Sequence, residues 1–440
     1  MIAVVVSRED VASLTIRDAL LRAADWEERE PSSEAWQREW AHDGFVMIEK
    51  DGLHLHYDGV DADLNEAFDI SLVVFVSRHS GDTGPLLTAH HTGNFGDAEY
   101  GGEDGSLATP APSATWHLLR RFADASPEDF DVGMEATHHG PSELETPSLF
   151  AEIGSGEDEW KREDAALAVA RAVLSLPDRE QPRATVVGVG GGHYAPRFTR
   201  VVLETDAAVG HIAADYALDE IDDALMCDAY ESSDADALLL DGDAADSPPE
   251  PTDGYPVVSE SHLRESTGVP ETTAEAVFDA LGDGARLTER ASHGVETIER
   301  FDAELVREAR TVDRDATDDA LEAHALGYTE EDGQVSGVVV PDDETRELAE
   351  ALADVLLGKY DTVSVEGDRL VAERDVFDAD RARELGVEEG PAFGRLSEGE
   401  TVDVGGRKVE PEEVRDSERR RFSLPTSSRT GTTDGDTDEG

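Results

Sequence analysis

The sequence predicts an α/β fold built on a largely parallel or mixed sheet. Apolar runs of strand length recur along the first half of the chain, and segments with helical spacing lie between them. The runs at residues 70–76 and 184–189 are continuously apolar, which is typical of strands covered on both faces. With 440 residues, the chain is longer than one ordinary domain usually needs.

The first half contains a series of predicted strands and helices. Residues 2–6 form an apolar strand, and residues 10–23 have helical spacing. Residues 45–56 mix apolar and polar positions as a hairpin around Lys50-Asp51-Gly52 would. After the strand at 70–76, the remaining predicted elements are a helix at 112–123, a short strand at 132–137, a helix at 163–176, a strand at 184–189 and a helix from Ile212 onward.

The composition changes after about Tyr230. Residues 241–253 are acidic and contain prolines, which indicates a linker or an exposed loop, and residues 261–281 are again helical. Beyond about residue 291 the chain is very acidic, with helical periods at 303–325 and 344–357 and short strands at 362–365 and 401–404. We therefore predict a catalytic core at residues 1–290, an acidic α+β extension at 291–425 and a disordered Ser/Thr/Gly/Asp-rich tail at 426–440.

The charge of the chain is extreme. It has 101 acidic and 37 basic residues, a formal net charge of −64, and only four of the basic residues are lysine. This composition is typical of a halophilic protein, because at ~1 M salt the screening length falls to ~3 Å and self-repulsion weakens. A disordered acidic chain is the alternative, but periodic apolar segments recur over all but the tail. Salt also screens attraction to phosphates, so the charge neither supports nor excludes an RNA partner.

The chain has a single cysteine, Cys227, which excludes an internal disulfide and a thiolate metal cluster. A bound metal would therefore use mainly His, Asp or Glu. The N-terminal MIAVVVSRED has no basic leader and no cleavage site, and no apolar run approaches the ~18 residues of a membrane span. We expect a soluble, cytoplasmic protein that is a monomer and binds neither membrane nor DNA.

Five segments place polar chemistry at predicted strand or helix ends, where α/β folds build their sites. They are SRHSG through LLTAHHTGN (77–94), MEATHHGP (134–141), FAEIGSG (150–156), GVGGGHYAPRF (188–198) and GHIAADY (210–216). Each segment alone also has a structural interpretation: a solvated loop, a core histidine or a helix cap. Together, four histidine-bearing segments with adjoining glycines and Glu152 indicate a hydrolytic metal site.

Two of these segments have a more specific interpretation. The glycines 190–192 end a strand, but His193 replaces the last glycine of a dinucleotide fingerprint, and no Lys-Ser/Thr pair follows. A glycine turn that delivers His193 into a site fits better. His211 is expected at a helix start, where a neutral imidazole suitable for metal binding is favoured.

In this order, the runs SRHSGDTGPLLTAHHTGN, MEATHHGP, AEIGSGEDEW, GVGGGHYAPRFT and VGHIAADYAL resemble the archaeal type of D-aminoacyl-tRNA deacylase, which plants also possess. The resemblance covers roughly residues 1–287. It implies a zinc-dependent esterase that splits the bond between a D-amino acid and the 3′-terminal ribose of tRNA. It also implies a three-layer core related to peptidyl-tRNA hydrolases and nucleoside phosphorylases, with two zinc ions per chain.

The resemblance also implies site residues. The metal ligands carried over are His90, His138, His139, Glu152, His193 and His211. His91 departs from the expected pattern and is left out, and the sequence does not assign ligands to individual ions. We interpret Glu152, His138 and His193 as catalytic, and we expect Asn94, Glu135 and Gly190–Gly192 to bind substrate.

This set of residues suggests a mechanism. Zinc with an open position polarises the ester carbonyl and lowers the pKa of bound water towards ~7. Glu152 or Glu135 could accept the proton, and the amides of Gly190, Gly191 and Gly192 could support the oxyanion.

Alternatives remain open at this point. The stretch LGVEEGPAFGRL, with the residues to Val414, resembles part of tRNA 3′-processing nucleases. We interpret it as a small β-hairpin packed on the core, and a tRNA contact is the alternative. Two other functions compete with deacylation. One is a peptidyl-tRNA hydrolase-like or phosphorylase-like enzyme on the same fold, and the other is a non-catalytic tRNA-binding protein with structural histidines.

Overall fold

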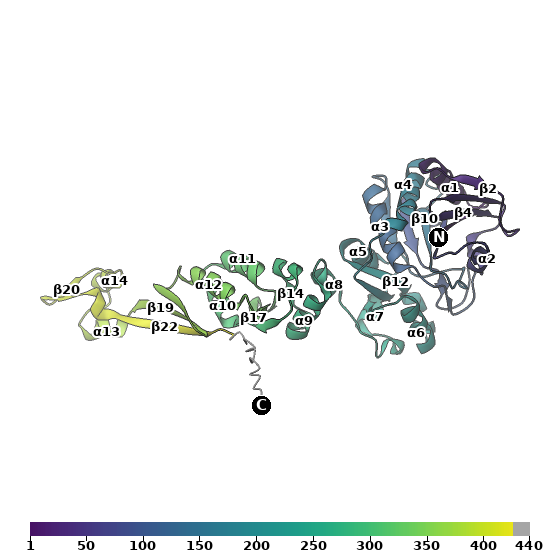
Figure 1. The fold of residues 1–440 in the computed structure, drawn as a ribbon. Helices are drawn as coiled ribbons and strands as arrows, with labels where there is room; N and C mark the ends of the chain where they lie inside the picture. The colour runs from purple at the N-terminus through teal and green to yellow at the C-terminus, as the bar shows by residue number, and fades with distance from the viewer. Residues whose placement is uncertain (426–440) are drawn as a thin grey trace, which may run out of the picture. The chain divides into compact units, whose positions relative to one another are not determined.

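The computed structural model describes residues 1–425, and the tail expected to be disordered lies outside them. The chain divides into two compact units, Met1–Thr267 and Gly268–Gly440. Figure 1 shows the elements of each unit along the chain. In the described part, no helix is long and apolar enough to cross a membrane.

The first unit is built on an eight-stranded mixed sheet, in which the strands have the order β2-β3-β4-β1-β5-β10-β6-β9. Four neighbours, β4, β1, β5 and β10, run parallel, whereas β6 is antiparallel to β10. A smaller parallel sheet has the order β12-β11-β13. The strands are β1 (Ile2–Ser7), β2 (Glu27–Arg29), β3 (Arg38–His42), β4 (Phe45–Lys50), β5 (Leu72–Arg78), β6 (Leu86–His90), β7 (Gly93–Asn94), β8 (Ser106–Leu107), β9 (Asp131–Met134), β10 (Ser148–Gly154), β11 (Ala184–Val189), β12 (Ala207–Ala213) and β13 (Ala237–Leu240).

The helices of this unit make it a three-layer structure, as predicted. Val4 and Val6 of β1 pack with α1, α3 and α4 on one face of the large sheet, and Ala3 and Val5 pack on the other face with α2. The helices are α1 (Val11–Ala23), α2 (Val60–Ala67), α3 (Pro112–Ala125), α4 (Glu163–Leu174), α5 (Pro196–Glu204), α6 (Asp223–Ser232), α7 (Gly242–Asp246) and α8 (Glu260–Ser266). The predicted α/β fold with a mixed sheet is confirmed.

Two local predictions in this unit are wrong. The hairpin near residue 45 joins β3 to β4 and turns at Asp43-Gly44, where Gly44 has φ +74°, rather than at Asp51-Gly52. The predicted helix from Ile212 begins instead as strand β12, parallel to β11, and His211 therefore lies within a strand. A short apolar run buried on both faces has no period that separates strand from helix.

The second unit begins earlier than the predicted extension. The predicted helix at 261–281 is two helices, α8 and α9 (Glu271–Leu281), which the Gly268–Pro270 stretch separates. Val277 and Phe278 of α9 pack with Leu326 and Val339 of the second unit. The boundary consequently lies at Thr267/Gly268, whereas the sequence predicted about residue 290.

The second unit has α+β architecture. A four-stranded sheet has the order β14-β16-β17-β15, and a three-stranded sheet the order β18-β19-β22. The predicted hairpin near residue 404 is β20–β21, and Val402 and Val409 pack with Ala382 and Leu396 of this unit rather than with the catalytic core. Its strands are β14 (Arg286–Leu287), β15 (Ile298–Arg300), β16 (Gly327–Glu331), β17 (Gln334–Pro341), β18 (Thr362–Glu366), β19 (Arg369–Phe377), β20 (Val402–Val404), β21 (Arg407–Val409) and β22 (Arg415–Ser423), and its further helices are α10 (Ala303–Arg310), α11 (Arg314–His324), α12 (Thr345–Leu356), α13 (Ala379–Glu384) and α14 (Pro391–Ser397).

Candidate functional site

Seven polar side chains from separate segments of the first unit meet beside the large sheet. Strand β10 lies between β5 and β6, so Glu152 is level with Ser77 on one side and with Thr88 on the other. His90 is paired with Phe150 in the same way, and alternation along the strand puts both on the face of Glu152. The seven residues are His79, His90, Glu135, His138, His139, Glu152 and His193.

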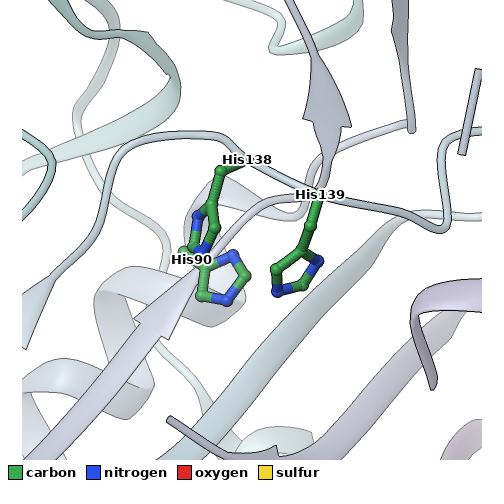
Figure 2. A group of neighbouring side chains, drawn as sticks. All are labelled: His90, His138 and His139. Carbon is green, nitrogen blue, oxygen red and sulfur yellow. The ribbon is translucent and has the colours of Figure 1, made fainter. Parts of the chain in front are cut away.

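These residues form three overlapping groups in which a metal ion could be held. In each group the candidate ligand atoms lie within 4.8 Å of one another. The groups are His90 with His138 and His139, Glu135 with His138 and His193, and His79 with Glu135 and Glu152. Figure 2 shows the first group, with the three imidazole rings turned towards one another. Because His138 and Glu135 each belong to two groups, the arrangement is one continuous cluster.

The imidazoles of the first group are held in the tautomer that binds metals. In each of the three rings Nδ1 lies close to a main-chain carbonyl oxygen, which can only accept a hydrogen bond. The distances are 3.1 Å from His90 to His91, 2.8 Å from His138 to Ala136 and 2.7 Å from His139 to Gly140. Nδ1 therefore carries the proton, and Nε2 presents a lone pair to the group.

The aromatic ring of Phe150 forms the apolar support of this group. It stacks on His90 with the ring centroids 5.2 Å apart, and the ring of His139 meets it edge-on at 5.0 Å. His139 itself has φ +47°, a left-handed conformation that is uncommon for a residue with a side chain. The backbone turn thus aims His138 and His139 at one point although they are adjacent in sequence.

The carboxylate of Glu135 lies at the centre of the cluster and is buried. Its Oε2 is 3.0 Å from Nε2 of His193, and its Oε1 is 3.2 Å from Nδ1 of His79. Burial acts to raise the pKa of Glu135, but these two imidazoles outweigh it and hold the pKa well below its usual range. Glu135 is therefore an anion surrounded by imidazoles.

The second carboxylate, Glu152, is fixed from the opposite side. The hydroxyl of Ser77 donates a hydrogen bond to its Oε1. Its Oε2 lies 3.8 Å from Nδ1 of His79 and 3.8 Å from Nε2 of His90. These distances are too long for direct hydrogen bonds and leave Oε2 facing the cluster.

Ionisation of the imidazoles depends on which carboxylate each one faces. Burial lowers the pKa of His138, and it lowers that of His139 to about 3, with the neighbouring imidazole of His90 adding to both effects. Burial also acts to lower the pKa of His90, but Glu152 outweighs it and the net shift is upward. The cluster thus combines the neutral imidazoles of His138 and His139 with the anionic carboxylate of Glu135, and zinc is bound by imidazole nitrogen and carboxylate oxygen of this kind.

Three buried atoms of the cluster could contact a cation. Several buried side-chain atoms of residues 1–425 make no hydrogen bond, and three of them lie in the cluster: Nε2 of His79, Nε2 of His90 and Oε1 of Glu135. Unsatisfied polar atoms are rare in protein interiors and require an explanation. Because all three belong to the cluster, a bound metal ion fits the residues present.

The predicted site residues do not all reach this cluster. His90, Glu135, His138, His139, Glu152 and His193 do. His211 does not: its Nδ1 is 3.0 Å from Thr137 Oγ1 and its Nε2 is 3.0 Å from the carbonyl oxygen of Ala108. With both ring nitrogens engaged and a pKa that burial lowers to about 3, His211 is placed as a structural residue.

The predicted substrate-binding residues also differ in position. The amides of Gly190 and Gly191 donate to Ala213 and to Asp215, so neither amide is directed at a substrate oxyanion. The side-chain amide of Asn94 donates to the carbonyls of Gly101 and Glu103 and braces that loop, although Asn94 also lines a cavity. Gly192, the third predicted glycine, precedes His193 in the turn between β11 and α5.

Sequence reasoning missed His79. It follows β5 directly and is 5 % exposed, and its backbone amide donates to Ile153 of β10. The signal was present in the SRHSG run, where a polar segment follows a fully buried strand. Taken alone, that segment also fits a solvated loop, because the sequence does not show in which direction the ring of a single histidine after a strand points.

Two cavities of about 400 Å³ each open onto the cluster. They share the side chains of Tyr100, His138, His139 and His193. Asp97, Glu99 and Glu220 line one cavity, and Arg78, His79 and Glu152 line the other. The cluster is therefore accessible from two sides that differ in charge, as a site that accommodates two parts of one substrate would be.

Comparison with known proteins agrees with this geometry. Residues 66–251 match the family model described as D-aminoacyl-tRNA deacylase, a range that contains all seven cluster residues. The D-aminoacyl-tRNA deacylase of Natronomonas pharaonis is 46 % identical, and that of Haloarcula marismortui is 40 % identical, each over 96 % of this chain and 100 % of the relative.

A solved structure is also similar. A crystal structure described as that of a conserved protein of unknown function superposes with a TM-score of 0.56 and is 34 % identical, covering 61 % of this chain and 98 % of its own. The curated relatives, in contrast, match this chain over nearly its full length, including the second unit. The chain belongs to the D-aminoacyl-tRNA deacylase family.

Proposed function

We propose that this chain hydrolyses the ester bond of D-aminoacyl-tRNA and releases free D-amino acid and tRNA. Family membership supports the substrate class. The observation that carries the chemistry is the continuous His/Glu cluster at the meeting point of two cavities. Such an activity removes mischarged tRNA before it is used and belongs in the cytoplasm, where tRNA is charged. The chain would act as a monomer.

The cluster fits zinc, and its overlapping groups offer room for two ions. We infer that Nε2 of His90, His138 and His139 would hold one ion, and that Glu135, with His193 or His79, would contribute to a second. His211 is no longer in the proposed ligand set, and His79 joins it. When bound, zinc polarises the ester carbonyl and makes water nucleophilic at neutral pH.

The chain's own residues then position the reactants. Glu152 is the proposed general base, because Ser77 fixes its Oε1 while its Oε2 faces the cluster. His193, whose side chain is 33 % exposed, lies at the mouth of both cavities and would contact the substrate ester. The ring of Tyr194 packs beside it, with the centroids 5.1 Å apart.

The test is a comparison of two substrates in molar KCl. D-tyrosyl-tRNA and L-tyrosyl-tRNA are incubated with the protein, with and without chelator, and release of tyrosine is followed. We expect release from the D-substrate only, lost on chelation and restored by zinc. Equal release from both substrates, or indifference to chelator, would overturn the proposal. A phosphorylase-like activity would require phosphate, and a non-catalytic tRNA-binding protein would release nothing.

A further inference from the structure

Arg78 lines the cavity that contains Glu152, and its guanidinium has no acidic partner there. Within residues 1–425 no carboxylate oxygen lies within 4.0 Å of its guanidinium, in a chain with 101 acidic residues. Its backbone amide, not its side chain, is the group that donates to Asp10. An arginine without a carboxylate partner can direct its guanidinium N–H donors to an anionic ligand.

The position of Arg78 links it to the catalytic cluster. It lies between Ser77, which bonds to Glu152, and His79, which faces both carboxylates. Arg78 lines the same cavity as Glu152, His138 and His193. A group bound by Arg78 would therefore lie within one cavity of the reacting ester.

The side chain of Arg78 is held in place by Trp160. Its guanidinium carbon lies 5.2 Å from the centroid of the indole ring, within cation–π range. The indole Nε1 donates a hydrogen bond to the carbonyl oxygen of His79 at 2.9 Å. Trp160 thus fixes both the arginine and the backbone of a cluster residue, so that the charge is presented in a defined place.

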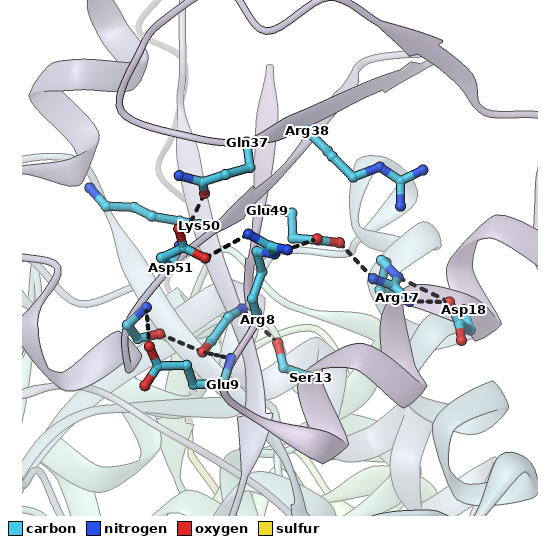
Figure 3. Close-up of polar contacts among 12 residues, drawn as sticks. Arg8, Glu9, Ser13, Arg17, Asp18, Gln37, Arg38, Glu49, Lys50 and Asp51 are labelled. Carbon is cyan, nitrogen blue, oxygen red and sulfur yellow. Dashed lines mark hydrogen bonds and ion pairs between the residues drawn. The ribbon is translucent and has the colours of Figure 1, made fainter.

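The neighbouring cations have acidic partners, and Figure 3 shows the ion pairs of Arg8 and Arg17. Lys50 ends β4 and Arg8 directly follows β1, and because β4, β1 and β5 are consecutive parallel strands, both lie in the row of strand ends to which Arg78 belongs. Arg8 is bound to Asp51 at 2.8 Å and to Glu49 at 3.3 Å, and Arg17 also holds Glu49, at 2.6 Å. Lys50 has a distant acidic partner, Asp63, at 3.9 Å.

We propose that Arg78 binds a backbone phosphate at the 3′ end of tRNA and so directs the terminal nucleotide into the Arg78-lined cavity. This inference rests on the proposed function. The cavity lined by Asp97, Glu99 and Glu220 then receives the aminoacyl group, whose free α-ammonium is cationic. In molar salt, screening removes long-range attraction to RNA, so recognition of a phosphate depends on direct contact of this kind.

The experiment compares a substrate that has phosphates with one that lacks them. Arg78→Gln, Arg78→Lys and the wild type are assayed in full-length protein on D-tyrosyl-tRNA and on D-tyrosine ethyl ester. For Arg78→Gln we expect KM for D-tyrosyl-tRNA to rise about tenfold, the loss of one charged hydrogen bond. The KM for the ethyl ester should change much less than the KM for tRNA, and an unchanged circular dichroism spectrum shows that the variant is folded. Arg78→Lys should recover part of the affinity.

Salt dependence gives a second measure. Over a series of KCl concentrations, the slope of log KM for tRNA against log salt should fall by about 0.7 in Arg78→Gln, the amount expected for one lost single-strand phosphate contact. Arg121→Gln on α3, an exposed arginine paired with Asp124, is the matched control and should change neither quantity.

The inference and the proposed function can fail separately. If wild-type protein deacylates D-tyrosyl-tRNA but Arg78→Gln has an unchanged KM, the phosphate contact is refuted and the proposed function stands. Equal loss of activity on tRNA and ethyl ester also refutes it, because Arg78 would then act on the chemistry. If the wild type cleaves the ethyl ester but not D-tyrosyl-tRNA, the proposed function itself fails.

Discussion

Nε2 of His193 lies 3.0 Å from Oε2 of Glu135, although 58 residues separate them in the sequence. His193 is delivered by the glycine turn after β11, and Glu135 by the segment after β9, so the contact joins the large sheet to the small one. The backbone supports the same junction, since the amide of Ala136 donates to the carbonyl oxygen of His193 at 2.8 Å. The His/Glu cluster thus lies where the two sheets of the first unit meet.

Because Glu135 belongs to two of the three ligand groups, its charge should contribute more to zinc affinity than the charge of any surface carboxylate. We expect Glu135→Gln to lower zinc content measured by mass spectrometry after dialysis. The loss of affinity should exceed the roughly 10- to 100-fold cost of losing an outer-shell partner. Glu145→Gln, an exposed neighbour in the same connection, is the control. Full zinc content in folded Glu135→Gln would exclude Glu135 as a ligand.

Two adjacent histidines should behave differently. Nε2 of His90 faces the cluster, whereas both ring nitrogens of His91 are used, with Nδ1 3.0 Å from Gly210 and Nε2 2.9 Å from Thr115. We expect His90→Ala to lose zinc and activity. His91→Ala should keep its zinc and lose about 2 kcal/mol of stability, because it leaves a buried carbonyl and a hydroxyl unpaired. Zinc content and denaturant unfolding of both variants test this, and the reverse pattern would contradict the assignment.

Much of the fold follows from sequence pattern alone. Long periodic segments such as Pro112–Ala125 and Glu163–Leu174, and the buried strand Leu72–Arg78, lie within a few residues of where pattern predicts them. Pattern does not predict the strand Ala207–Ala213, because AAVGHIA is buried on both faces and its small residues are equally compatible with a helix. The family resemblance implied His211 as a ligand, and only the argument for its neutral imidazole depended on the expected helix start, which the structure replaces with a strand.

The site itself is only partly encoded in local sequence. Family-type runs identify six residues as a set, and the structure brings five of them together without His211: His90, His138, His139, Glu152 and His193. His79 and the central place of Glu135 could not be predicted, because they depend on how β5, β9 and β10 lie in the sheet. The direction of a side chain after a strand end is fixed by tertiary packing and not by neighbouring residues.

Zinc should stabilise the unit that binds it. A ligand specific for the native state adds about 2.7 kcal/mol at 100 times its dissociation constant. We expect added zinc to raise the temperature at which peptides of Met1–Thr267 become susceptible to thermal proteolysis, read by mass spectrometry. The effect should disappear in His138→Ala, which removes a ligand shared by two groups. An unchanged zinc effect in that variant would place the metal elsewhere.

In the second unit, the buried carboxylate of Glu308 should make the free energy of unfolding depend on pH. Burial acts to raise its pKa, but hydrogen bonds from Lys359 and Tyr360 and the charge of Arg420 lower it below 4.5. A carboxyl group with a lowered folded-state pKa contributes stability that is complete above pH 4.5 and is lost as the pH falls through the lowered value. Glu308→Gln should therefore cost about 2 kcal/mol at neutral pH, because Lys359 and Arg420, whose side chains are 32 % and 34 % exposed, lose a charged hydrogen-bond partner.

The measurement is unfolding by denaturant at a series of pH values, followed through peptides of Gly268–Gly440. The difference between wild type and Glu308→Gln should shrink steadily below pH 4.5, since the wild-type carboxylate becomes protonated there. Glu347→Gln, at an exposed position on α12, should lie within about 0.5 kcal/mol of wild type. A constant difference between wild type and Glu308→Gln down to strongly acidic pH would show that packing of Glu308, and not its charge, stabilises this unit.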